Sequence, residues 1–95
     1  MLINVCFDLH ASIIECDVND SIENINNKLE NWLYEVKEDN NGRYIQVKES
    51  LNIDVLDISV IVRFFSEVYP NSKPKIKVEK TNINKINDNL PTINL

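Results

Sequence analysis

Glycine is nearly absent from this sequence, because Gly42 is the single glycine among 95 residues. Phosphate-binding loops use glycines to bring the backbone close to the ligand, so such a loop is hard to arrange away from Gly42. Long apolar runs are absent too. The longest apolar region, residues 60–65, is interrupted by Arg63, whereas a membrane-spanning helix needs about 20 apolar residues. The sequence therefore predicts neither a nucleotide-binding loop nor a membrane span.

Cysteine and histidine are scarce, with Cys6, Cys16 and His10 as their only representatives. No basic segment precedes the first apolar stretch, and Asp8 interrupts it, so no secretory signal is predicted. We expect a cytoplasmic protein with free thiols. Alternation along a strand places Cys6 and His10 on the outer face and Cys16 on the inner face, which disfavours a zinc site, a Cys–His nucleophile and a disulfide. We therefore expect Cys16 in the core and Cys6 and His10 on the surface.

No catalytic motif is present, and no cofactor or metal site is predicted. Acid–base chemistry by His10 with Asp8 stays open, because residues two apart share a strand face.

The composition is that of an ordinary globular protein, with 43% hydrophobic and 26% charged residues. We expect one domain over residues 1–80. Residues 81–95, rich in asparagine, are expected either to fray or to add a short edge element.

Two strands are predicted at the N-terminus. Residues 2–10 alternate between apolar and polar side chains, and residues 13–18 do so again. A turn near residues 10–12 would join them into a hairpin. Two further strands are predicted over residues 43–48 and 73–80, each with one apolar face.

Two helices are predicted, over about residues 21–38 and 55–69. Asp20 or Ser21 is expected to cap the first helix, where Asp20-x-x-Glu23 resembles a capping box, and this helix is expected to end at Asn40-Asn41-Gly42. The second has many β-branched residues, so a strand for part of it stays possible, and residues 51–56 fit either a strand or a helix. Side chains at helical spacing form the expected buried faces: Ile22, Ile25, Leu29, Trp32, Leu33 and Val36 in the first helix, and Ile58, Ile61, Val62, Phe65, Val68 and Tyr69 in the second.

The predicted fold class is α+β, an α/β two-layer sandwich with the order β-β-α-β-α-β. Each strand has only one apolar face, so we expect a four-stranded sheet with both helices packed on one side of it.

Charge is sorted along the chain. The net charge is −5; residues 1–39 contribute −7, residues 40–72 contribute −1 and residues 73–95 contribute +3. Such sorting bears on partners and on association rates rather than on fold. We expect an acidic surface on the first helix and the N-terminal hairpin, with an exposed Tyr34 as its anchor. The candidate partner-binding residues are Glu23, Asn27, Glu30, Asn31, Tyr34, Glu38, Asp8, Glu15 and Asp17.

Lysines at alternate positions mark the last predicted strand, at Lys73, Lys75 and Lys77. Such a row can contact phosphates, but lysines on an edge strand also prevent aggregation. With a net charge of −5, nucleic acid is not the expected partner.

The second helix is so apolar that Val60 and Phe64 are expected on its flanks, as a contact for a homodimer.

Two function classes remain. The first is a non-enzymatic acidic protein-binding module, such as an immunity or inhibitor protein that neutralises a basic toxin or nuclease. The second is a structural or regulatory homo-oligomer that associates through the second helix.

Overall fold

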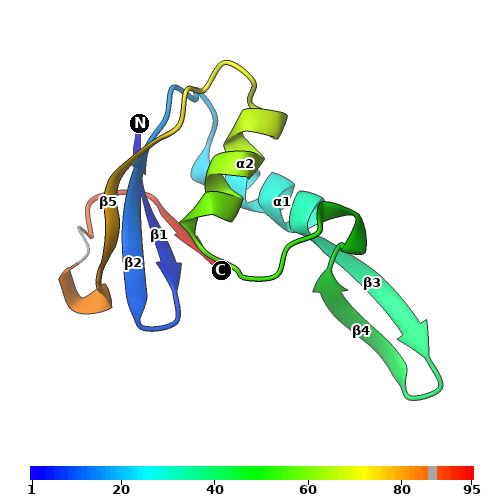
Figure 1. Ribbon diagram of the computed structural model, residues 1–95. Coiled ribbons are helices and arrows are strands. Elements are labelled where there is room, and N and C mark those ends of the chain that lie inside the picture. The colour runs from blue at the N-terminus through cyan, green and yellow to red at the C-terminus, as the bar shows by residue number, and fades with distance from the viewer. Residues whose placement is uncertain (86–87) are drawn as a thin grey trace.

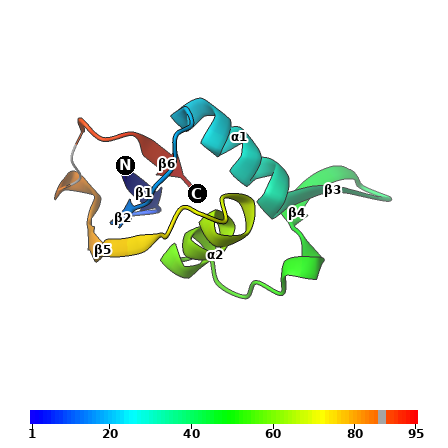
Figure 2. The same ribbon diagram turned by 90° about the horizontal axis from the view of Figure 1, so that it is seen from above.

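The computed structural model describes residues 1–85 and 88–95, which form an α+β fold (Figure 1). A four-stranded sheet has the order β5-β2-β1-β6, and β3 and β4 form a separate two-stranded hairpin. Both helices pack on one side of the four-stranded sheet, as Figure 2 shows from above. The elements are β1 (Leu2–Phe7), β2 (His10–Glu15), α1 (Ile22–Leu33), β3 (Tyr34–Asp39), β4 (Gly42–Val47), the short 3-10 helix η1 (Glu49–Leu51), α2 (Ile58–Val68), β5 (Lys75–Asn82), a second 3-10 helix η2 (Ile83–Lys85) and β6 (Thr92–Asn94).

The fold class and the four-stranded sheet with helices on one side are confirmed. The element order is wrong in two places. The described chain has the order β-β-α-β-β-α-β-β, because residues 34–39 form a strand rather than the end of the first helix, and residues 92–94 add a strand. Residues 43–48 do not join the main sheet; most of them form β4 of the separate hairpin.

β1 and β2 form an antiparallel hairpin whose turn begins two residues earlier than predicted. Phe7 pairs with His10, so the loop is Asp8–Leu9, and Asp8 takes a positive φ of 54°. Aspartate tolerates the left-handed region better than most residues, which permits this tight turn. Because the chain turns after Phe7, His10 belongs to β2 and does not share a strand face with Cys6.

The outer face of β1 is covered, contrary to expectation. Asn4 and Cys6 are buried, so the prediction of Cys6 as a surface residue is wrong, whereas the core position of Cys16 is confirmed. After β5 the chain crosses to the opposite edge of the sheet on the side away from the helices (Figure 2). It returns as β6, which pairs in parallel with β1. β6 is thus a short strand at the edge of the sheet.

α1 ends at Leu33, five residues before the predicted end. Its first turn is capped by Ser21, whose side chain accepts a hydrogen bond from the backbone N–H of Asn24. At the other end Tyr34 is already extended. Residues 34–39 then pair with residues 42–47 across a turn at Asn40–Asn41, with Gly42 at a φ of 117°. The glycine ends a hairpin turn rather than a helix.

α2 is buried more deeply than its predicted role as a contact surface requires. Asp57 caps it by accepting a hydrogen bond from the backbone N–H of Ser59. Val60 and Phe64 belong to the core between α1, α2 and the sheet. The expected homodimer contact through these two residues is therefore wrong: the single chain already covers them. Trp32 packs against this core at its edge, and its indole N–H donates to Glu67.

Asp20 ties the start of α1 to the end of α2. Its carboxylate accepts hydrogen bonds from the Tyr69 hydroxyl at 2.7 Å and from the Asn24 amide at 3.0 Å. The ammonium of Lys28 lies 3.3 Å from the same carboxylate. These donors, first of all the Tyr69 hydroxyl, lower the pKa of Asp20 to about 2.

No helix within the described residues is long and apolar enough to cross a membrane.

Candidate protein-binding surfaces

The acidic residues expected to form one surface lie in separate places. Asp8 sits in the turn at one end of β2, whereas Glu15 and Asp17 lie at the other end. Glu15 is 3.8 Å from the ammonium of Lys77 on β5. Glu15 and Asp17 also share a shallow pocket with Lys73 and Lys75. Part of the acidic N-terminal segment is thus neutralised by the basic C-terminal segment inside the same molecule.

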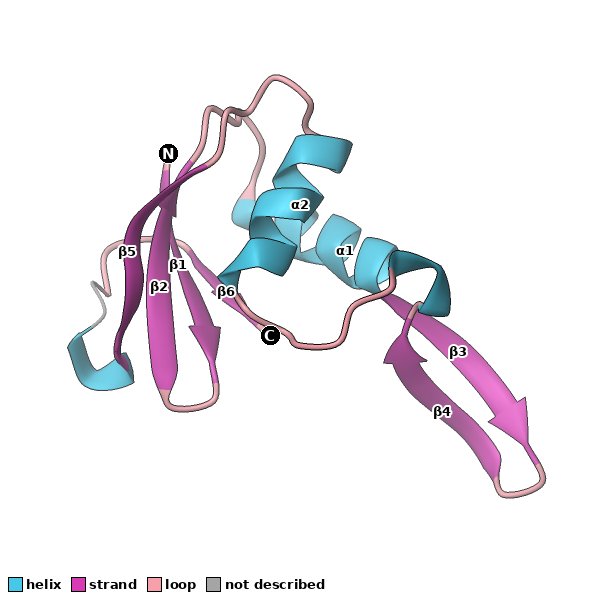
Figure 3. Cartoon of the chain, in the orientation of Figure 1, coloured by secondary structure: helices cyan, strands magenta, loops and turns pink. Residues whose placement is uncertain are grey.

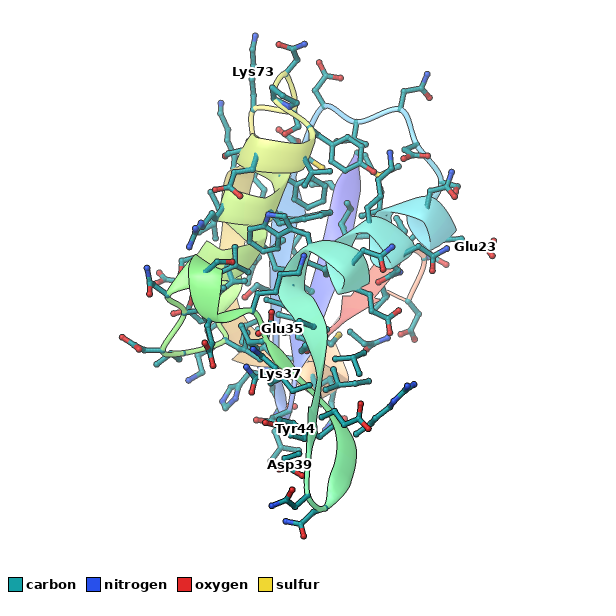
Figure 4. All side chains as sticks on the ribbon, turned by 90° about the vertical axis from the view of Figure 1, so that its right-hand side faces the viewer. Glu23, Glu35, Lys37, Asp39, Tyr44 and Lys73 are labelled. Atoms are coloured by element: carbon teal, nitrogen blue, oxygen red, sulfur yellow. The ribbon has the colours of Figure 1, made fainter. Side chains whose placement is uncertain are left out.

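The exposed face of α1 keeps its predicted character. Glu23, Asn27, Glu30 and Asn31 are all exposed on this helix. Neither Glu23 nor Glu30 has an ion-pair partner among the described residues, whereas the other charged residue of α1, Lys28, is paired with Asp20. In Figure 4, Glu23 points away from the body of the protein. The two carboxylates are therefore available to a partner.

Tyr34 does not lie on that exposed helical face. It is the first residue of β3, is half-buried, and packs against the core. Its backbone N–H donates to the carbonyl of Glu30, which closes the last turn of α1. Glu38 lies further along β3 and is separated from the helix. The idea of an exposed tyrosine surrounded by helical carboxylates is therefore wrong, because the helix ends one residue before Tyr34.

Tyr34 and Glu30 nevertheless meet in a pocket of about 250 Å³ beside α1. Asn26 and Leu29 of the helix and Asn94 and Leu95 from the end of the sheet complete its lining. The amide of Asn26 donates to the carbonyl of Ile22 at 3.1 Å and to that of Thr92 at 3.4 Å. The second of these bonds joins α1 to β6 beside the pocket.

The β3–β4 hairpin, residues 34–47, is a feature that the sequence patterns did not reveal; we call it the arm. It projects from the body of the protein, away from the four-stranded sheet (Figure 3). Val36 and Ile45 are cross-strand neighbours on one face of the arm and are 65% and 67% exposed. A lone two-stranded hairpin is only marginally stable in water, and exposed apolar pairs often mark contact surfaces. The arm is therefore a second candidate surface.

The other face of the arm is polar. Gln46 donates to Glu35 at 3.1 Å, and the ammonium of Lys37 lies 3.6 Å from the same carboxylate. The bond from Gln46 is the main cause that lowers the pKa of Glu35. Lys37 is the cross-strand neighbour of Tyr44. Figure 4 shows Glu35, Lys37, Tyr44 and Asp39 following one another from the root of the arm toward its tip.

The lysine row lies at an edge strand, where lysines can prevent aggregation, as the sequence analysis considered. β5 is the outer strand of the sheet, and Lys75 and Lys77 are exposed on it. Lysines at such an edge hinder pairing with another chain. Lys73 precedes this strand and extends outward in Figure 4.

No group of three or more His, Cys, Asp or Glu side chains able to hold a metal ion occurs within residues 1–85 and 88–95. Cys6 and Cys16 are free thiols. Burial raises the pKa of both, which makes the unreactive thiol form dominant. His10 is exposed at the start of β2. None of these residues is brought into a shared site.

No family model, curated protein or solved structure that was compared with this chain matches it. Two features of the described residues remain as candidate binding surfaces: the arm, and the pocket lined by Glu30 and Tyr34, which we call the acidic pocket.

Proposed function

We propose that this chain is a non-enzymatic binding module for a basic protein, of the kind that inhibits a toxin or nuclease by covering its basic surface. The observation that carries the proposal is the pocket beside α1, whose lining includes both Glu30 and Tyr34. The exposed Glu23 extends the same acidic surface along the helix.

A lysine or arginine side chain of the partner suits this pocket. Its cationic head would form an ion pair with Glu30, and the face of Tyr34 would add a cation–π contact. Its aliphatic stem would lie against the apolar atoms of Leu29 and Leu95, as long basic side chains commonly do. A carboxylate beside an aromatic ring therefore selects a basic residue over an acidic or a purely apolar one.

The charge of the whole molecule supports the same kind of partner. A net charge of −5 attracts a basic protein during diffusional encounter and speeds association. Ions screen such steering, because the Debye length falls from about 30 Å at 0.01 M salt to about 8 Å at 0.15 M. We therefore expect the affinity for the partner to fall as salt concentration rises.

The test uses Glu30→Gln with Glu79→Gln as the matched control. Both variants remove one negative charge, but Glu79 is an exposed residue of β5 outside the acidic pocket. Affinity capture from the native cell at about 0.01 and 0.15 M salt identifies the partner, and calorimetry with the purified partner gives Kd. We expect Glu30→Gln to weaken binding about 10-fold, equivalent to about 1.4 kcal/mol, and Glu79→Gln to leave it nearly unchanged.

Equal binding by the two variants would contradict this proposal, as would a partner whose Kd is independent of salt. Thermal unfolding of both variants serves as the check on folding. Both positions are exposed, so we expect their unfolding temperatures to match that of the wild type.

A further inference from the structure

The outer edge of β3 has a defined set of free backbone groups. In an antiparallel hairpin, directly opposite residues alternate between those that exchange hydrogen bonds and those that do not. Lys48 donates its backbone N–H to the carbonyl of Leu33, which sets the phase of this alternation. The backbone groups of Glu35 and Lys37 consequently point toward β4. Those of Val36 and Glu38 point to the outer edge, together with the carbonyl of Tyr34.

The side chains along this edge are complementary to a second copy of themselves. If two β3 strands pair antiparallel about a two-fold axis at Val36, each Val36 faces Val36 of the second copy. Each Glu35 then faces Lys37 of the second copy, and each Lys37 faces Glu35. Charges on an edge strand usually oppose pairing, but this register places opposite charges directly across from each other.

The backbone and the side chains require the same register. Val36 exchanges two hydrogen bonds with Val36 of the second copy, because its N–H and C=O both point outward. The N–H of Glu38 reaches the carbonyl of Tyr34 across the axis. The N–H of Tyr34 takes no part, since it already donates to Glu30. The two-fold axis therefore lies at Val36, where the two copies can exchange two backbone hydrogen bonds.

Pairing also extends the exposed apolar face of the arm. Val36 and Ile45 lie on the same face of the arm. A two-fold axis perpendicular to the sheet places the corresponding side chains of the second copy on that same face of the combined sheet. The four strands β4-β3-β3-β4 would therefore carry a continuous row of Ile45, Val36, Val36 and Ile45. Three or more strands with an apolar face are far more stable than an isolated hairpin.

The edge of β4 lacks the charge complementarity of the β3 edge. A two-fold axis at Ile45 would pair Arg43 with Val47 and Tyr44 with Gln46, without any charge pair. In Figure 3, β3 lies on the side of the arm that faces away from the four-stranded sheet, so a second arm can approach it. The two bodies would lie at opposite ends of the paired strands. In this register Tyr34, at the root of one arm, lies opposite Glu38 of the second copy, so the two roots are separated by four residues along the strands, about 13 Å. This exceeds the Debye length of about 8 Å at physiological salt.

We infer that two copies of this chain associate through the outer edges of β3, forming a four-stranded intermolecular sheet. Such pairing needs no basic partner, and the residues that test it, Glu35 and Lys37, lie on the arm, whereas Glu30 lies on α1. Loss of the dimer and loss of partner binding are therefore separate experimental outcomes.

The test compares three charge variants by sedimentation equilibrium. Lys37→Glu places a carboxylate opposite Glu35 of the second copy, so the dimer contains two pairs of like charges, and we expect dimerisation to weaken at least 10-fold. Arg43→Glu is the matched control, because it makes the same change in net charge on β4. The double variant Glu35→Lys with Lys37→Glu exchanges the two charges and restores their complementarity. We expect it to dimerise within about 3-fold of the wild type.

Amide hydrogen exchange supplies a second readout that does not depend on any substitution. As protein concentration rises, we expect exchange of the Val36 and Glu38 amides to slow, whereas the Lys37 amide, which already bonds to β4, is unaffected. A wild-type chain that stays monomeric at millimolar concentration would overturn the inference. Equal effects of Lys37→Glu and Arg43→Glu, or a double variant that does not recover, would do so too.

Discussion

Phe64 offers the sharpest test of how this fold is held together. Its side chain is 0% exposed. Its ring makes edge-on contacts with Trp32, Phe65 and Tyr69, at centroid distances of 5.6, 5.2 and 6.0 Å. Phe64→Ala removes these contacts and leaves a cavity where α1 meets α2. Substitutions of this kind cost about 3–5 kcal/mol, so we expect the free energy of unfolding to fall by about 4 kcal/mol.

That loss is a large part of the total stability. A domain of this length is stabilised by about 5–14 kcal/mol. Urea denaturation followed by the fluorescence of Trp32, the single tryptophan, measures the change. With an m-value of about 1–3 kcal/mol/M, the midpoint should fall by about 1–4 M. Ser66→Ala, at an exposed position of the same helix, is the control and should change the unfolding free energy by less than about 0.5 kcal/mol.

The result also separates the observed core from the expected homodimer contact. If Phe64 were a contact between copies, the denaturation midpoint of the wild type would rise with protein concentration, because dissociation would accompany unfolding. A loss below about 1 kcal/mol in Phe64→Ala, or a concentration-dependent midpoint abolished by that substitution, would refute the buried position of this ring.

Three further predictions concern single sites. Asp20→Asn should flatten the acid limb of the stability curve: because folding lowers the pKa of Asp20, its contribution is present above pH 4 and is lost as pH falls through about 2, as urea titrations at pH 2–5 would show. Gly42→Ala should cost about 1 kcal/mol of arm stability, since the φ of 117° strains any side chain although no atom lies within 4 Å of the added Cβ; amide exchange in β3 would report it. Lys73→Gly should stabilise the protein by up to about 1 kcal/mol, because Lys73 holds a φ of 48°, and a higher unfolding temperature would confirm this.

The arm shows where local patterns misled the prediction. Val36 continues the helical spacing of Leu29, Trp32 and Leu33, and Asn40-Asn41-Gly42 fits the end of a helix. The same residues also fit a hairpin, in which an Asn-Gly pair follows one alternating strand and precedes another. The exposure of Val36 in the structure shows that pairing across the turn outweighed helical periodicity. Alternation on both sides of the turn was the signal that could have revealed it.

The acidic pocket was predictable in its residue types but not in its position. Glu30 and Tyr34 were both candidates, yet their meeting with Asn94 and Leu95 depends on β6. Sparse apolar residues in an asparagine-rich segment do not indicate which strand they join, and β6 pairs with the most distant strand in the sequence. Burial of Cys6 has the same origin. The caps at Ser21 and Asp57 lie where local rules place them, because capping involves only neighbouring residues.

The pairing of β1 with β6 has a consequence for folding kinetics. About 90 residues separate the two strands in the sequence, so their contact has a high sequence separation and forms slowly. At a synthesis rate of about 5–20 residues per second, β1 waits roughly 5–18 s for its parallel neighbour. During that time β2 can cover one edge of β1, but the other edge exposes unpaired N–H and C=O groups. That edge of β1 can therefore pair with another chain until residues 92–94 cover it.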